Sequence, residues 1–155
     1  MDDINFRSAT SADAEQVADI YLESRKTFLA YAPLVHSDDA IRQWIAGHLI
    51  PSGGVTVAST NDVLTLIVGM MALSRNESVG WIDQLYLRPT FVECGIGSHF
   101  VENAKAELGP PIQLHTFQEN GGARRFYERQ GFRILELGDG SGNEEDCPDI
   151  LYEWA

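Results

Sequence analysis

The chain has 155 residues, 44% of them hydrophobic, and a formal net charge of −12. Its length and composition predict one domain over residues 1–155 with a sizeable core. The negative charge argues against a general nucleic-acid binder, which needs a basic face. No apolar run is long enough for a membrane helix, and the N-terminus lacks the basic and apolar regions of a signal peptide, so we expect a cytoplasmic protein. Cys94 and Cys147 fit no metal-ligand spacing, so we expect free thiols and no metal site.

Residues 3–54 predict a strand followed by two amphipathic helices. Residues 3–9 alternate apolar and polar side chains, as a half-buried strand does. Thr10 and Asp13 match a capping box at a helix start. The residues expected on the buried face of this helix are Val17, Ile20, Tyr21, Ser24 and Phe28. A second helix is expected to begin near Ser37 and to bury Ile41, Trp44, Ile45 and Leu49.

Residues 55–154 predict a sheet with two further helices. Strands at 55–60 and 63–73 form a hairpin about Asn61-Asp62. The stretch 79–87 is apolar on both faces apart from Asp83 and Gln84, as a central strand should be. The elements expected after it are a helix with the buried stripe Ile96, Phe100, Val101, Ala104 and Leu108, a strand at 112–116, a helix at 120–130, and strands near 132–137 and 148–154. A right-handed strand–helix–strand crossover makes the two central strands parallel, within a mixed α/β sheet.

Two glycines mark the loop between the central strand and its helix. Gly95 and Gly97 remove side chains where the backbone turns, so the N–H groups of the helix N-terminus can face an anion. On these residues alone, a plain strand-to-helix turn is the better explanation of the pattern. A dinucleotide-binding loop is weakly supported, because it needs a third glycine at the position of Phe100.

Two longer stretches together resemble the GCN5-related N-acetyltransferase (GNAT) superfamily. One runs from Leu85-Tyr86-Leu87-Arg88-Pro89 to Gly95-Ile96-Gly97-Ser98, and the other is N-x-x-A-x-x-F-Y-E-x-x-G-F from Asn120 to Phe132. The resemblance implies an acetyl-CoA-dependent N-acetyltransferase that acts on a primary amine. It also implies a mixed, mostly antiparallel sheet of about six or seven strands, with a central parallel pair and flanking helices.

The same resemblance implies which residues hold acetyl-CoA. The loop whose backbone binds the pyrophosphate of coenzyme A corresponds to Val92, Glu93, Cys94, Gly95, Ile96, Gly97 and Ser98. The family usually has Gln or Arg where this chain has Val92, and the Glu93 carboxylate is electrostatically unfavourable beside a pyrophosphate. The pantetheine arm corresponds to Leu85, Tyr86 and Leu87. The following helix supplies Asn120, Ala123, Phe126 and Tyr127.

The chemistry implied by the resemblance needs an acid, an oxyanion donor and a base. Tyr127 matches the tyrosine that protonates the leaving thiolate, and a phenol with a pKa near 10 suits that task. The Leu85 backbone N–H is the candidate oxyanion donor. His115 and Asp83 are rival general bases, with ordered water as a third possibility. The structural alternatives are a core aromatic for Tyr127, a structural histidine for His115 and a hydrogen-bonded core carboxylate for Asp83.

The acceptor is the least defined part of the sequence. Phe28 and Tyr31 lie in the first helix–loop–helix segment, which in the family covers the acceptor site. Glu144 and Glu145 lie in an acidic loop that is expected to attract a cationic amine, unless it is only solvated. The acceptor is expected to be a small-molecule or peptide amine, and a homodimer is common in the family. A non-catalytic acyl-CoA-binding or regulatory module is the alternative function; the unusual loop permits it, whereas Tyr127 favours an enzyme.

Overall fold

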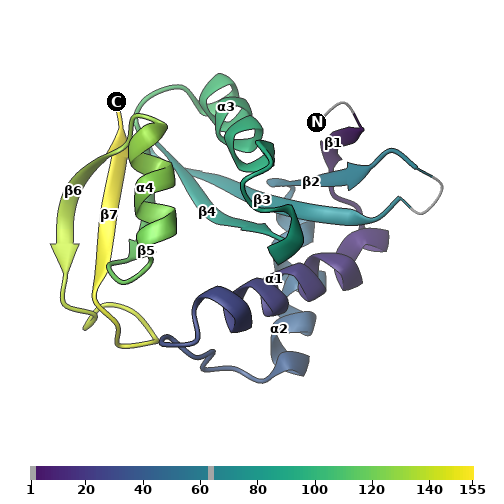
Figure 1. Cartoon of the computed structure of the whole chain (residues 1–155), viewed down its shortest axis with the longest axis horizontal. Helices are drawn as coiled ribbons and strands as arrows, with labels where there is room; N and C mark the ends of the chain where they lie inside the picture. The colour runs from purple at the N-terminus through teal and green to yellow at the C-terminus, as the bar shows by residue number, and fades with distance from the viewer. Residues whose placement is uncertain (1–2, 63–64) are drawn as a thin grey trace.

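A computed structural model describes the chain over residues 3–62 and 65–155. The strands in these ranges are β1 (Ile4–Ser8), β2 (Val55–Thr60), β3 (Ile67–Asn76), β4 (Val79–Leu87), β5 (Ile112–Phe117), β6 (Arg133–Gly138) and β7 (Asp149–Trp154). Within the described residues they form one seven-stranded sheet in the order β1-β2-β3-β4-β5-β7-β6 (Figure 1). Strands β4 and β5 pair in parallel and the other neighbours pair antiparallel. The expected mixed fold with a central parallel pair is therefore confirmed.

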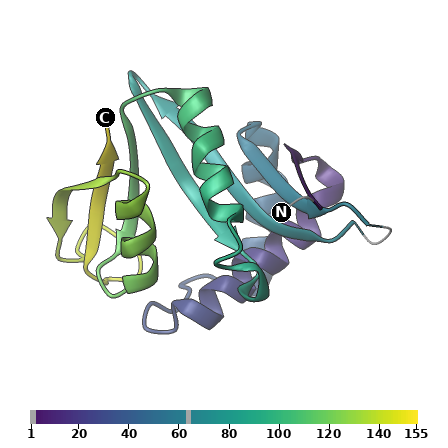
Figure 2. The same ribbon diagram turned by 45° about the horizontal axis from the view of Figure 1, so that its top comes forward.

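Helices cover both faces of the sheet. They are α1 (Ala14–Phe28), α2 (Asp38–Trp44), α3 (Ile96–Leu108) and α4 (Gly121–Arg129). Helices α3 and α4 lie on one face of the sheet and α1 and α2 on the other (Figures 1 and 2). A core that includes Phe100 and Tyr152 lies beneath the first pair, and a second core, which includes Ile20 and Met70, lies beneath the other pair. Strand β3 is buried on both faces over Ile67–Leu73 because it lies between these two layers. No helix in the described ranges has both the length and the apolar character needed to cross a bilayer.

Asp13, which ends the short 3-10 turn Ser11–Asp13 just before α1, joins the start of this helix to the first strand. The Asp13 carboxylate accepts the Thr10 N–H at 2.8 Å, as the capping-box pattern predicts. It also accepts two hydrogen bonds from the Arg7 guanidinium of β1, at 2.7 and 2.9 Å. At the other end of α1, the Ser24 hydroxyl donates to the Leu87 carbonyl. These contacts fix α1 across the sheet at the point where β4 ends.

The predicted bounds of the third strand, 63–73, are wrong. Residues 63 and 64 lie outside the described residues. Thr65 has a φ of +45°, which is not extended backbone, and β3 begins only at Ile67. It continues to Asn76, where Glu77 with a φ of +58° makes the turn into β4. Backbone turns, rather than the end of the apolar run, therefore set both ends of this strand.

Two aromatic side chains expected in the core are exposed. Phe28 is 45% exposed and Trp44 is 38% exposed. Phe28 is the last residue of α1, so no further turn of that helix covers it. Ile41 and Ile45 carry the buried stripe of the second helical segment, and Trp44 lies at the margin of that stripe. The expectation that Phe28 and Trp44 are buried is wrong, and Phe28 is accessible on the surface near the end of α1.

Candidate active site

The central parallel pair opens into a cleft. Strands β4 and β5 pair only at their beginnings, Gly80 with Ile112 and Trp81 with Gln113, and then diverge (Figure 2). A cleft of about 110 Å³, here called the slot, lies between the diverging strands. Its lining comprises Leu29 after α1, Ile82, Asp83, Gln84, Leu85 and Tyr86 of β4, Leu114, His115, Thr116 and Phe117 of β5, and Asn120, Ala123 and Tyr127 at α4. Beyond Trp81, the edge of β4 that faces β5 has no strand partner among the described residues. Apart from the Leu87 carbonyl, which accepts the Ser24 hydroxyl, its backbone groups are therefore available to an extended ligand.

A β-bulge helps to separate the two strands. The pairing of β3 with β4 shifts from Ala72–Gln84 to Leu73–Ile82, which leaves Asp83 as the extra residue, and such a bulge bends its strand. The Asp83 side chain is exposed, so its interpretation as a core carboxylate is wrong. Loss of water around the carboxyl nevertheless raises the pKa of Asp83, and a hydrogen bond with Ser74 partly opposes that rise.

The glycine loop presents backbone donors at the start of α3. Gly95 has a φ of +86° and is the N-cap of the 13-residue helix α3, and its left-handed conformation explains the glycine. Among the described residues, none accepts a hydrogen bond from the backbone N–H groups of residues 94–98. A Cβ atom on Gly97 would lie 3.2 Å from the Phe126 ring, so this glycine lets α3 and α4 approach closely. The loop therefore fits a phosphate group bound by backbone amides.

Helix α4 places Tyr127 against the slot. Asn120 caps this helix by accepting the Ala123 N–H at 3.1 Å, as its N-cap interpretation predicts. The Tyr127 side chain is 8% exposed, and its ring lies 5.0 Å from that of Phe126 and 5.7 Å from that of Phe132. Burial, and next the nearby Tyr86, raise the pKa of Tyr127 well above its ordinary value. The phenol therefore keeps its proton at neutral pH and is available there as a proton donor.

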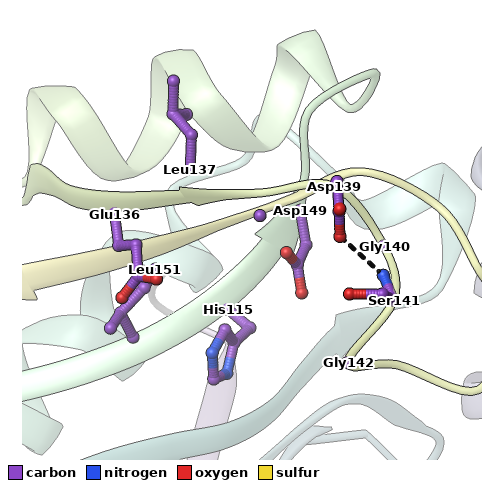
Figure 3. A pocket seen from close by; sticks show the side chains of 10 residues that line it. His115, Glu136, Leu137, Asp139, Gly140, Ser141, Gly142, Asp149 and Leu151 are labelled. Carbon is purple, nitrogen blue, oxygen red and sulfur yellow. Dashed lines mark hydrogen bonds between the residues drawn. The ribbon is translucent and has the colours of Figure 1, made fainter.

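His115 reaches the slot from the opposite face of the sheet. Its neighbour Leu114 is buried beneath α4, so the His115 side chain points to the other face, where it is exposed and stacks on Trp81 at 5.5 Å. A hollow of about 480 Å³ adjoins it, lined also by Glu136, Asp149 and the loop at 138–142. Figure 3 shows His115, Glu136, Asp149 and Leu151 on one side of the strands and Leu137 on the other. The slot is therefore bordered by Tyr127 from the α4 side and by His115 from the hollow.

The acidic loop between β6 and β7 is tied to the end of α1. Glu145 Oε2 lies 3.0 Å from Arg25 Nη2, and the two side chains are 14% and 6% exposed. Glu144 pairs with His36 at 3.2 Å on the surface. Burial alone would lower the pKa of the Arg25 guanidinium, but Tyr86 and Glu145 raise it above its ordinary value. A solvated loop therefore does not describe Glu145, which holds a buried cation.

Arg25 is the site-adjacent residue that the sequence interpretation missed. It lies one helical turn after Tyr21, on the face expected to be buried. A charged residue on a buried face was the available signal, because such a residue needs a partner. Tyr31, expected at the acceptor site, packs its ring against Phe117 at 6.2 Å. Phe117 lines the slot, so Tyr31 lies directly behind the slot wall.

Comparison with known proteins identifies the family. A family model described as the acetyltransferase (GNAT) family matches residues 15–132, which include β4, the glycine loop, α3, β5 and α4. The chain therefore belongs to the GNAT acetyltransferase family. A search of curated proteins found no match.

Solved structures share the whole fold at low sequence identity. Apo YjaB from Escherichia coli is 20% identical with a TM-score of 0.76, covering 98% of this chain and 97% of that one. The PaiA N-acetyltransferase from Thermoplasma acidophilum, solved with coenzyme A, is 21% identical with a TM-score of 0.73, covering 97% and 98%. The ribosomal-protein-S18-alanine N-acetyltransferase from Escherichia coli is 11% identical with a TM-score of 0.70, covering 97% and 92%. These likenesses show the fold.

Proposed function

We propose that this protein binds acetyl-CoA and transfers its acetyl group directly to a primary amine within the slot. The observation that carries the proposal is a slot reached from both faces of the sheet, with the glycine loop and Tyr127 on one face and His115 on the other. Two structural neighbours support the cofactor. The PaiA protein was solved with coenzyme A, and the NatC complex was solved with Gag peptide and coenzyme A.

The residues around the slot fit coenzyme A from its phosphates to its thiol. The backbone N–H groups of residues 94–98 bind the pyrophosphate at the positive end of the α3 dipole. The unpaired edge of β4, at Leu85–Leu87, hydrogen-bonds the amides of the pantetheine arm as a neighbouring strand would. Glu93 is exposed, so solvent screens the repulsion between its carboxylate and the phosphates. Acetyl-CoA supplies an activated acetyl group as a thioester.

Each catalytic role falls to a residue that lines the slot. The Leu85 N–H donates to the carbonyl oxygen as negative charge develops on it. The amine nitrogen forms its bond to the carbonyl carbon, and the carbon–sulfur bond breaks. Tyr127 donates its proton to the departing sulfur. The proton that the amine loses passes to His115, Asp83 or ordered water, and both side chains border the slot.

The hollow beside His115 is the route by which the acceptor approaches. Glu136, Asp139 and Asp149 line it, and carboxylates on one side of a cleft attract an ammonium group. The attraction expected of Glu145 is weakened, because Arg25 already pairs with it, and neither Glu144 nor Glu145 lines the hollow or the slot. We therefore assign the approach of a small-molecule or peptide amine to the hollow rather than to those two glutamates.

An acceptor screen tests the proposal. The protein is incubated with acetyl-CoA and a panel of amines, and free thiol is followed over time. We expect thiol release that depends on at least one amine. Binding of coenzyme A measured by calorimetry, without thiol release for any amine, would instead support the non-catalytic acyl-CoA-binding alternative.

A further inference from the structure

Arg25 is a buried cation behind the wall of the slot. Its side chain is 6% exposed. Its Nη2 atom donates to the Ala32 carbonyl at 3.1 Å and to Glu145 Oε2 at 3.0 Å. The guanidinium carbon lies 5.8 Å from the ring centroid of Phe117, whose side chain lines the slot. The charge of Arg25 therefore lies directly behind the surface that an acceptor contacts.

Two buried polar atoms at this wall have no partner. Among the described residues, the buried side-chain atoms without a hydrogen-bond partner are Arg25 Nε and the Tyr31 hydroxyl oxygen. Both residues flank Phe117, since the Tyr31 ring lies 6.2 Å from that ring. Arg25 Nε is a donor, and the Tyr31 hydroxyl can also donate. Because a buried donor without an acceptor is destabilising, these two atoms together indicate a place for an oxygen-rich, anionic group.

Glu145 already brings a carboxylate to this place, but fills it incompletely. An arginine fork can hold a carboxylate through two parallel hydrogen bonds, whereas Glu145 uses one oxygen on one nitrogen. Glu145 comes from the β6–β7 loop, 120 residues from Arg25 in sequence. The same loop contacts the α1–α2 connection through Cys147 Sγ, 3.6 Å from the Tyr31 carbonyl. An external carboxylate could displace Glu145 and engage the two unpartnered donors as well.

We propose that the acceptor is an amine that also carries a carboxylate, as an amino acid does, and that Arg25 and Tyr31 bind this carboxylate in place of Glu145. The inference rests on the proposed acetyl transfer and specifies its substrate class. The ammonium end of the acceptor lies toward His115 and the acidic hollow, and the carboxylate end lies toward Arg25. A zwitterion therefore matches the charges on both sides of the slot. Glu145 acts as an internal competitor that holds the loop closed until the acceptor binds.

Matched pairs of acceptors test the carboxylate. L-amino acids and their carboxamides are compared as acceptors at low concentration with acetyl-CoA in excess. We expect at least one acid to exceed its carboxamide by about tenfold in kcat/KM, since a hydrogen-bonded charge pair discriminates by at least that factor. Equal use of every acid and its carboxamide, or preference for the carboxamides, would overturn the inference while leaving acetyl transfer established.

Variants separate binding from folding. Glu145→Gln should lower KM for the acid, because the competing charge is gone, and leave KM for the carboxamide unchanged. Arg25→Lys keeps the buried charge but loses the planar fork, so KM for the acid should rise by about tenfold with kcat little changed. Glu107→Gln, the same change on an exposed residue of α3, is the control and should alter neither KM. If the variants of Arg25 and Glu145 change KM for the acid and for the carboxamide by the same factor, the two residues have only a structural role and the inference is overturned.

Binding to the protein saturated with coenzyme A gives a readout independent of turnover. Calorimetric titration with the same amino acids should show tighter binding to Glu145→Gln than to the parent. No binding to either protein would overturn the carboxylate site. Failure of the proposed function is a separate result, in which no amine, with or without a carboxylate, releases coenzyme A.

Discussion

Replacing Tyr127 by phenylalanine removes one hydroxyl and keeps the packing of the ring. The ring lies 5.0 Å from Phe126, 5.7 Å from Phe132 and 6.4 Å from Tyr152, and phenylalanine preserves these contacts. Among the described residues, no side chain or backbone group hydrogen-bonds the Tyr127 hydroxyl. The stability of Tyr127→Phe should therefore lie within about 0.5 kcal/mol of the parent, as for changes that break no specific contact. Tyr127→Ala should cost about 3–5 kcal/mol, because it leaves a cavity in the core.

Turnover should respond differently, because the hydroxyl is the proton donor in the proposed chemistry. Loss of a general acid lowers the rate by about 10²-fold, which corresponds to about 2.7 kcal/mol of barrier. Stopped-flow thiol release and calorimetry with coenzyme A measure kcat and cofactor affinity separately, and affinity should not change. The raised pKa of Tyr127 keeps the phenol protonated, so kcat should show no loss from its ionisation near neutral pH.

Tyr152→Phe is the matched control for this substitution. Tyr152 is fully buried in the same core, and its hydroxyl donates to Glu128 Oε2 at 2.7 Å, away from the slot lining. Loss of that bond should reduce stability by about 1.5–3 kcal/mol, as for a hydrogen bond to a charged group, with no effect on kcat. If Tyr127→Phe keeps a kcat within a factor of about two of the parent, the general-acid role is refuted.

Three further perturbations test the loop, the base and the capping contact. Gly97→Glu should abolish coenzyme A binding, because the new side chain meets the Phe126 ring and puts a negative charge at the phosphate loop. The control Gly47→Glu, at an exposed glycine with open space around it, should bind coenzyme A normally. Equal affinities of the two variants in calorimetry would refute the assignment of the loop to the pyrophosphate. A general base must be deprotonated to accept a proton, so activity should rise with pH through the pKa of that base. Of His115→Gln and Asp83→Asn, the variant whose pH–rate profile loses this rise at low pH identifies the base. Unchanged pH–rate profiles for both variants would leave the role to water. The Arg7 guanidinium lowers the pKa of Asp13, so this pair stabilises the fold fully above about pH 4 and loses its effect as pH falls through the lowered pKa. Asp13→Asn should therefore cost about 1–3 kcal/mol of stability at pH 7 and progressively less as the pH falls below about 4, and a cost that does not change with pH would contradict the ionic interpretation.

The parts of the fold set by short-range patterns could be predicted. The apolar stripe that includes Ile96 and Phe100 places α3, and Asn120 marks the start of α4, because helix periodicity and capping depend only on neighbours in sequence. The glycine loop could be predicted for the same reason, because a turn before a helix depends on neighbouring residues. The insertion of β7 between β5 and β6 could not be predicted, because the sequence of a strand does not specify which other strand it pairs with.

The parts of the site set by long-range contacts could not be predicted. The bulge at Asp83 depends on the register between β3 and β4, and it turns an expected core carboxylate outward. The pairing of Arg25 with Glu145 joins residues far apart in the chain, and no local pattern connects them. The roles of His115 and Leu85 stay predictions, because the geometry places both at the slot without showing which group moves a proton or stabilises charge.

Direct acetyl transfer from acetyl-CoA to an amine across the slot can be followed with a labelled acetyl group. The protein is mixed with labelled acetyl-CoA, with and without an acceptor found in the screen. We expect the label to pass to the amine and the protein alone to take up none. Label that accumulates on the protein, for example on the exposed Cys94 thiol, and then moves to the amine would contradict direct attack. Label that stays on coenzyme A with every amine would contradict acetyl transfer itself.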